Sequence, residues 1–400
     1  MTKRILILGN YPVVNPQHGG QKRVEAIYRA YKGKSWSVMY VAIIPSKFYL
    51  MRGKHDIAVS ESTMHAIEAQ PLLGDILCGE AVYDDPKVKS RLLGIIMRFS
   101  PDIIQLEQPY IYLGLKKLLA DINYSGKIIN STQNIEFRMK EDIYKGEGMP
   151  APDRKRIVEK IRALEKDLAQ DAVLNVAVSE KDATQLADLL DAKNIIVIAN
   201  GMNQAKPEPY YIRKWKHYFR ARDVQREILF VGSAHQPNMT GFMKMVGKKV
   251  GFLPKHARIV VVGGVSDLIK DSLRDEVVED VCMPLRVELL GRRSEGDLNA
   301  LLSLADTIIL PITEGGGSNL KTAEALLSGK RIVATEHAFR GYDAYRTLPG
   351  IDITDSPQRF REFIERNVES SDSLLLPRPE TEGVLWEHIL ADLTERVEQL

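Results

Sequence analysis

The chain has 400 residues, a length that predicts two or three domains rather than one core. With 44% hydrophobic and 27% charged residues, its composition is that of a soluble globular protein. The formal net charge is only +2, which argues against a dedicated nucleic-acid binder and predicts no nucleic-acid partner.

Cysteine content and hydropathy indicate the cellular compartment in which the protein is expected. Cys78 and Cys282 are far apart and have no metal-ligand spacing around them, as is typical of a reducing cytoplasm. The first apolar run, residues 5–8, is too short for the core of a signal peptide. No stretch approaches the roughly 18 apolar residues that span a bilayer. We expect a cytoplasmic protein that is at most peripheral at the inner face of the cell membrane.

Residues 1–203 alternate between buried strands and amphipathic helices. Helices are expected where apolar residues recur on one helical face, at 24–31, 87–98 and 154–168. Strands are expected at short apolar runs, at 4–8, 37–44, 103–106, 127–129, 173–178 and 195–198. This alternation predicts an N-terminal α/β domain with a doubly wound parallel sheet, covered by helices on both sides.

A long loop between the first strand and the first helix ends in Gly19 and Gly20. Glycines at a helix N-terminus let an anion approach the backbone, and the basic pair Lys22 and Arg23 follows directly. The spacing of a dinucleotide-binding fingerprint is absent. Two interpretations stay open: a ligand loop, or a structural turn followed by two solvated cations.

Residues 204–225 combine prolines with a cluster of basic and aromatic residues. A segment between two predicted domains is typical of an interdomain linker that packs its aromatic side chains. A basic aromatic cluster can also contact an anionic membrane surface. We favour the linker, because a domain boundary is expected at this position.

A second alternation of strands and helices follows the linker. Its first three strands each end at a glycine and lie at 227–231, 258–262 and 287–290. Residues 226–378 are therefore expected to form a second doubly wound domain, with ligands at the carboxyl ends of its strands. The final segment, 379–400, has helical spacing and is compatible with packing on either domain.

Residues 306–336 are predicted to form a strand, a glycine loop, a helix and a further strand. Three glycines occupy 315–317, and either Ser318 or Asn319 is a suitable N-cap for a helix over 320–328. Glycines before a helix N-terminus let a phosphate approach the free N–H groups and the positive end of the helix dipole. The loop is therefore a candidate phosphate site.

Lys321 and Glu324 lie three residues apart on one face of this predicted helix. A cation in the first turn can meet a diphosphate, and a carboxylate one turn later can accept hydrogen bonds from sugar hydroxyls. The local pattern is equally compatible with an ordinary turn and a solvated ion pair, since short motifs have a high false-positive rate.

Several short motifs in this order resemble glycosyltransferase family 4, whose members have the GT-B fold. The motifs lie at 19–20, 132–136, 177–182, 199–201, 230–232, 290–291 and 315–325. Their order and spacing together make the resemblance specific, and it covers most of the chain. It implies two doubly wound, Rossmann-like domains facing across a cleft, with the acceptor on the N-terminal side and the nucleotide sugar on the C-terminal side.

The resemblance also implies a function. A hexosyltransferase of this kind moves a sugar from a UDP- or GDP-sugar to a glycan, lipid-linked or protein acceptor, as in polysaccharide biosynthesis. Transfer with retention, and without a metal or another cofactor, is what the resemblance implies. Glu324 falls where the family binds the ribose, and Lys321 with the amides of Gly316 and Gly317 falls at the diphosphate.

Other site residues follow from the same resemblance. Lys321, Glu314 and Asn134 are the expected catalytic residues, and Gln133 and Glu136 are expected to contact the acceptor or the donor sugar. The positions expected to bind the donor, besides Glu324, are Gly19, Gly20, Gly232, Gly316, Gly317, Ser318, Asn319 and Leu320.

Two positions in the second domain depart from the family pattern. Gly316 stands eight residues before Glu324, where the family usually has a glutamate, and Glu314 can replace it only if the loop is rearranged. No basic pair follows Gly232, and Lys321 is expected to supply that charge.

Gln133 is the third departure, because the family often has a histidine there. A glutamine can orient a hydroxyl but cannot exchange protons at neutral pH. Two alternatives therefore stay open: a non-catalytic nucleotide- or glycan-binding subunit with the GT-B fold, and a sugar-nucleotide epimerase. Product analysis separates them, because epimerisation needs no acceptor and a binding subunit neither transfers nor hydrolyses sugar.

Overall fold

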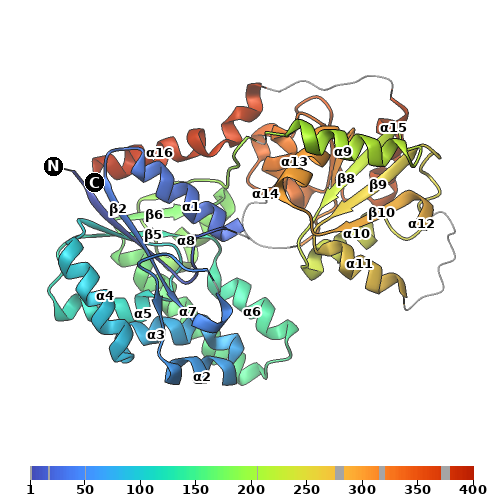
Figure 1. The fold of residues 1–400 in the computed structure, drawn as a ribbon. Helices are drawn as coiled ribbons and strands as arrows, with labels where there is room; N and C mark the ends of the chain where they lie inside the picture. The colour runs from blue at the N-terminus through green and yellow to red at the C-terminus, as the bar shows by residue number, and fades with distance from the viewer. Residues whose placement is uncertain are drawn as a thin grey trace. The chain divides into compact units, whose positions relative to one another are not determined.

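The computed structural model describes residues 2–16, 19–49, 51–204, 206–274, 283–314, 320–370 and 379–400. The chain forms two compact units, the first made of Met1–Ala199 with Ile389–Leu400 and the second of Asn200–His388 (Figure 1). In the part of the chain that the structure describes, no helix combines the length and the apolar character needed to cross a bilayer.

The first unit contains a seven-stranded sheet in which all neighbours run parallel. The strands, in chain order, are β1 (Arg4–Gly9), β2 (Ser37–Ile44), β3 (Ile57–Ala58), β4 (Ile103–Leu106), β5 (Lys127–Ser131), β6 (Leu174–Ala177) and β7 (Ile195–Val197). Their order across the sheet is β3-β2-β1-β4-β5-β6-β7. Chain progression reverses between β1 and β4, which makes that position the topological switch point.

Helices cover both faces of this sheet, which explains why its central strands are apolar throughout. Residues 5–8 of β1 are all fully buried, as a parallel strand covered on both faces requires. The helices are α1 (Gly19–Lys32), α2 (Glu61–Ala69), α3 (Gly74–Asp84), α4 (Pro86–Phe99), α5 (Tyr112–Asp121), α6 (Glu136–Gly146), α7 (Ala151–Asp171) and α8 (Glu180–Leu190), with 3₁₀ turns at η1 (Ser46–Phe48) and η2 (Pro71–Leu73).

The C-terminal helix α16 (Trp386–Gln399) joins the first unit from Ile389 onward. Leu393 and Val397 are fully buried on its apolar face. At its end, Lys3 Nζ donates to the carbonyls of Val397 and Glu398, both at 2.8 Å. Cations near the last helical carbonyls are favourable, so both chain ends are held in the same unit.

The second unit contains a six-stranded parallel sheet. Its strands are β8 (Arg226–Val231), β9 (Ala257–Val262), β10 (Val287–Gly291), β11 (Thr307–Leu310), β12 (Arg331–Ala334) and β13 (Ile351–Ile353). They are ordered β10-β9-β8-β11-β12-β13, so the switch point lies between β8 and β11. The predicted pair of doubly wound parallel sheets is thus confirmed.

Helices flank this second sheet as well (Figure 1). They are α9 (Pro209–Arg220), α10 (Gln236–Met245), α11 (Val265–Arg274), α12 (Met283–Arg286), α13 (Glu295–Leu304), α14 (Leu320–Leu327) and α15 (Pro357–Glu369), with 3₁₀ turns at η3 (Glu336–Phe339), η4 (Asp343–Tyr345) and η5 (Pro379–Val384). Apolar side chains of the sheet form one buried cluster on each face.

Segment 204–225, expected as a linker, contains helix α9, which packs in the second unit. Trp215 and Phe219 are buried in its core, and Trp215 Nε1 donates to Asp297 Oδ1 of α13 at 2.9 Å. Lys214 forms an ion pair with the same carboxylate at 2.7 Å. The buried aromatic residues of this cluster therefore serve packing rather than a surface contact.

Candidate functional site

Two helices of the second unit begin at the switch point of its sheet. Helix α10 follows β8, and α14 follows β11, so their N-termini flank the position where chain progression reverses. Helix N-termini carry unpaired N–H groups and a partial positive charge that favour anions. In doubly wound sheets, ligands bind at the carboxyl ends of the strands at this position.

Lys321 connects these two helices. It lies in the first turn of α14, and its Nζ donates to Asn238 Oδ1, in the first turn of α10, at 2.5 Å. Asn238 is itself held, because its Nδ2 donates to the carbonyl of Ser233 at 3.0 Å. The ammonium group is thereby directed to the loop after β8, where this sequence lacks the basic pair that the family resemblance leads one to expect.

The charge of Lys321 is sensitive to its surroundings. Burial lowers the pKa of Lys321 from 10.5 to about 8, the nearby carboxylate of Glu324 opposes this, and the cation of Arg340 lowers the pKa further. Two cations and one carboxylate therefore act on one another at the start of α14. A bound anion would favour the protonated form of Lys321.

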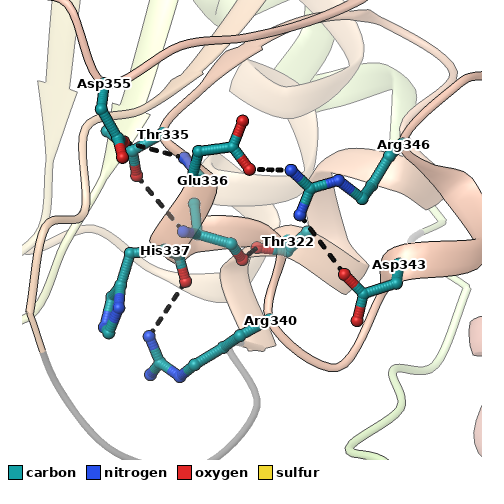
Figure 2. A network of polar contacts seen from close by, with 9 residues as sticks. Thr322, Thr335, Glu336, His337, Arg340, Asp343, Arg346 and Asp355 are labelled. Carbon is teal, nitrogen blue, oxygen red and sulfur yellow. Dashed lines mark hydrogen bonds and ion pairs between the residues drawn. The ribbon is translucent and has the colours of Figure 1, made fainter.

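Helix η3, which follows β12, is attached to helix α14 (Figure 2) and also to the loop after β11. The Thr335 hydroxyl donates to the carbonyl of Ile312 and accepts from the Ala338 amide. The Thr322 hydroxyl of α14 donates to the Ala338 carbonyl at 2.5 Å. These bonds place Arg340, two residues further on, beside the start of α14.

The arginines of this segment have different partners. Arg346 forms ion pairs with the carboxylates of Glu336 and Asp343, while Arg340 Nη1 donates to the carbonyl of His337 at 3.0 Å (Figure 2). Arg340 is half-buried. We call Asn238, Lys321, Glu324 and Arg340 the switch-point site.

Gly232 lies at the end of β8, where the strands approach closely. Its amide donates to the Val262 carbonyl at 2.9 Å, and its own carbonyl accepts from the Val265 amide at 3.1 Å. A Cβ at Gly232 would lie 2.8 Å from Val265 Cγ1. At neighbouring Gly263, φ is +101°, and a Cβ would collide with the Gly232 carbonyl. The structure thus gives Gly232 a packing role at the site's edge.

Part of the predicted donor loop lies outside the described residues, namely Gly316, Gly317, Ser318 and Asn319. Glu314, the last described residue before them, is exposed. Leu320 is the first residue of α14, and it is half-buried, as are Lys321 and Glu324.

The first unit carries a polar cluster at its own switch point. Asn10 and Tyr11 follow β1, and the Tyr11 hydroxyl donates to Gln133 Oε1, after β5, at 2.8 Å. Asn10 is only 6% exposed, yet neither polar atom of its side chain has a hydrogen-bond partner in the described part of the chain. Gln133 Nε2 is buried and has no hydrogen bond of ordinary length there, although the Gln133 side chain lies near enough to the buried Glu107 carboxylate to lower its pKa. Buried polar groups are usually paired with protein or ordered water, so these amides are candidates for contact with water or a ligand.

Gly20 closes this cluster. A Cβ at Gly20 would lie 2.5 Å from the Tyr11 hydroxyl and would collide with the Gln133 amide oxygen, so a larger residue would displace one of these two side chains. The structure thus brings together two predicted site residues, Gly20 and Gln133, that are far apart in sequence. We call Asn10, Tyr11, Gly20 and Gln133 the first-unit cluster.

The loop expected to end at Gly19 and Gly20 ends earlier, because both glycines form the first turn of α1. Of the two cations that follow, only Lys22 is exposed. Arg23 is buried, and its Nη1 donates to the carbonyls of Ile198 at 2.9 Å and Ala199 at 3.2 Å. Solvation of both cations is therefore wrong, since Arg23 ties α1 to the chain after β7.

Glu136 lies in a buried network. It is 3% exposed, accepts from the Tyr110 hydroxyl at 2.8 Å and from Asn134 Nδ2 at 3.4 Å, and burial raises its pKa. The Glu165 carboxylate accepts from the amides of Glu136 and Phe137, both at 2.8 Å, and so caps α6. In this arrangement Glu136 positions α6, and half-buried Asn134 is the better candidate for a ligand contact.

Sequence reasoning missed four residues that the fold brings to these sites: Asn10, Tyr11, Asn238 and Arg340. Asn10 and Tyr11 directly follow the first predicted strand, a position that favours ligand contact in doubly wound sheets. No local pattern marks Asn238 or Arg340, because their importance depends on contacts with α14.

Residues 225–364, which hold the switch-point site, match a known protein family, the one described as Glycosyl transferases group 1. In a comparison with curated protein sequences, none matches the chain.

Solved structures match over nearly the whole chain. Anabaena Alr3699/HepE in complex with UDP has a TM-score of 0.65 at 14% identity, with 99% of this chain and 100% of that chain covered. The same protein with UDP-glucose gives 0.62 at 14%, with 99% of each covered. Sucrose-phosphate synthase from Thermosynechococcus elongatus gives 0.72 at 13%, again with 99% of each. At these identities the likeness establishes the fold, which is GT-B.

Proposed function

We propose that this protein transfers a sugar from a nucleotide sugar to an acceptor, because residues 225–364 match the glycosyl transferases group 1 family and the chain has the GT-B fold. The observation that carries the proposal is the contact between Lys321 and Asn238 at the switch point, with Glu324 one turn further along α14. It supplies a cation for a diphosphate and a carboxylate for a ribose at the edge where such sheets bind ligands.

In this proposal the switch-point site binds the donor. Glu324 accepts hydrogen bonds from the ribose hydroxyls, and Lys321 with Arg340 neutralises the diphosphate. The amides of Gly316 and Gly317 approach the phosphates from the start of α14. Stabilising the charge that develops on the leaving diphosphate lowers the barrier to transfer.

The first-unit cluster is the proposed contact for the sugar or the acceptor. Asn10 and Gln133 offer buried amide groups that sugar hydroxyls would satisfy. We propose retention and metal independence, with Glu314 and Asn134 as further catalytic candidates, on the family resemblance of the motifs. Because Alr3699/HepE was solved with UDP-glucose, a UDP-hexose is the first donor to test. The proposed acceptor is a glycan, a lipid-linked sugar or a protein.

A nucleotide panel tests the donor site. Thermal unfolding would be followed with UDP, GDP, ADP and CMP in the presence of EDTA, for the wild type and Glu324→Ala. A ligand at about 100 times its Kd should stabilise the protein by roughly 2.7 kcal/mol. Loss of the ribose hydrogen bonds should weaken binding by roughly 1.5 to 3 kcal/mol. The absence of any nucleotide effect on the wild type would contradict the proposal.

Arg340→Gln separates the phosphate contacts from the ribose contacts in the same assay. The change should weaken UDP binding and leave binding of uridine unaltered, because only UDP carries the diphosphate. Arg346→Gln is the matched control, since its guanidinium is already neutralised by Glu336 and Asp343. Equal effects of both changes would remove Arg340 from the site.

A non-catalytic nucleotide-binding subunit is the second candidate, favoured by Gln133 where the family often has a proton-exchanging histidine. Such a protein would give the nucleotide effects above but would neither transfer nor hydrolyse UDP-hexose. Release of UDP on addition of acceptor extracts, measured by chromatography, decides between the two.

A further inference from the structure

A basic pocket lies on the first unit, separate from the first-unit cluster. Its volume is about 300 Å³. The side chains around it include three cations, one histidine and one hydroxyl, and no carboxylate. The lining residues are Lys54, His55, Ser90, Arg91, Gly94, Ile95 and Arg98.

The pocket lies between helix α4 and the segment that leads into the edge strand β3. Lys54 and His55 precede β3, and the other lining residues belong to α4. None of the residues that follow β1 or β5 in the first-unit cluster lines it. A ligand in this pocket would therefore not occupy the proposed sugar or donor positions.

No carboxylate of the described residues forms an ion pair with the cations of the pocket. In the described ranges, Lys54, Arg91 and Arg98 form neither an ion pair nor a side-chain hydrogen bond. By contrast, Lys89 on another face of α4 pairs with Asp121 at 3.2 Å. Helix α4 contains four basic residues and no acidic one. Like charges held together without a carboxylate favour an anion from outside.

Gly94 lines the pocket beside the Arg98 side chain. A Cβ at this position would lie 3.2 Å from Nη1 of Arg98, so the guanidinium rests against the helix backbone there. Glycine is disfavoured in a helix interior relative to alanine. Its presence here gives Arg98 room on the same helical face as Arg91, three residues before Gly94.

We propose that this pocket binds a phosphate group, carried either by an anionic phospholipid headgroup or by a soluble phosphorylated compound. Arginine forks match phosphate oxygens in a bidentate geometry, and Lys54 and Ser90 add donors from two segments of the chain. Lys87 is exposed on the same face of α4, and Met97, the residue before Arg98, is 62% exposed. An exposed apolar side chain beside cations is typical of a membrane surface, which favours the headgroup.

The test uses the full chain and two probes. Inorganic phosphate is titrated by calorimetry, and co-sedimentation is measured with phosphatidylcholine vesicles that contain or lack phosphatidylglycerol. Arg91→Gln/Arg98→Gln should weaken binding about tenfold or more, because charge-assisted hydrogen bonds are lost. Arg156→Gln/Arg162→Gln, with the same loss of charge on exposed positions of α7, should bind as the wild type does.

The outcomes separate the sources and the alternatives. Binding of phosphate supports a soluble ligand, and binding only to the anionic vesicles supports the headgroup. Lys54→Gln should also weaken binding, because the pocket needs both segments. No binding of either probe, equal effects of the two double variants, or no effect of Lys54→Gln would overturn the pocket. The UDP effect on thermal unfolding should be unaltered in every variant, so this test is independent of the proposed function.

Discussion

At the scale of single residues, the protonation of Lys321 decides how the switch-point site acts on an anion. The pKa of about 8 results first from burial, and a diphosphate would replace the lost solvation with its own charge. In the free protein the folded form binds fewer protons than the unfolded form between pH 8 and 10.5. The cost of burying the charge is therefore fully present below about pH 8 and is relieved as the pH rises toward 10.5.

We predict that UDP affinity falls as the pH rises above about 8, by at most about tenfold per pH unit, because the free protein then loses the Lys321 proton. Calorimetric titrations from pH 7 to 9 would measure this. Lys321→Arg should remove the dependence, since arginine keeps its charge, and Lys321→Gln should bind weakly at every pH. A wild-type affinity that is flat over this range would exclude a phosphate contact by Lys321.

At the scale of elements, the position of α10 depends on a close backbone approach to the loop after β11. A Cβ at Gly241, in the middle of α10, would collide with the carbonyl of Pro311. This contact fixes the helix that carries Asn238 against the strand that leads to α14. The spacing of α10 and α14, which flank the switch point, thus depends on the absence of a side chain at Gly241.

Gly241→Ala is predicted to destabilise the protein although alanine favours helices. Overpacking of this kind costs about 1 to 3 kcal/mol, against a propensity gain of about 0.5 to 1 kcal/mol. Urea unfolding measures the difference. Gly251→Ala is the control, because a Cβ at Gly251 meets nothing within 4 Å and its stability should be unaltered or slightly raised. An equally stable Gly241→Ala protein would show that the helix can move away from β11.

At the scale of the whole molecule, the first unit is assembled from both ends of the chain. Residues 389–400 pack there, far in sequence from residues 1–199 that make up the rest of the unit. The second unit, Asn200–His388, is continuous. Stability of the first unit therefore depends on residues 389–400 as well as 1–199, whereas the switch-point site depends on contacts inside the second unit.

Leu393→Ala is predicted to destabilise the first unit by about 2 to 5 kcal/mol, as expected for a fully buried leucine. Hydrogen exchange should show lost protection in β1 and β5 and unaltered protection in β8 and β11, with UDP binding retained. Glu395→Ala, an exposed position on the same helix, is the control. Equal loss of protection in both units would mean that they unfold as one.

The sequence by itself determined the fold class and the positions of most strands. Apolar runs that end at glycine, such as 227–231 before Gly232, need only local chemistry to be strands, and β8 covers Arg226–Val231. The short strands β3 and β13 were missed, because runs of two or three residues have no periodicity. Lys321 and Glu324 were recognisable for a similar local reason, since three residues in a helix place two side chains on one face.

Only the tertiary structure decided which distant residues share a site. Lys321 meets Asn238, 83 positions away, and Tyr11 meets Gln133, 122 positions away. It also assigned Arg23 and Glu136 to buried networks and the C-terminal helix to the first unit. The physical reason is that strand order and register, which bring the ends of β8 and β11 together, follow from packing the whole sheet and leave no trace in any local pattern.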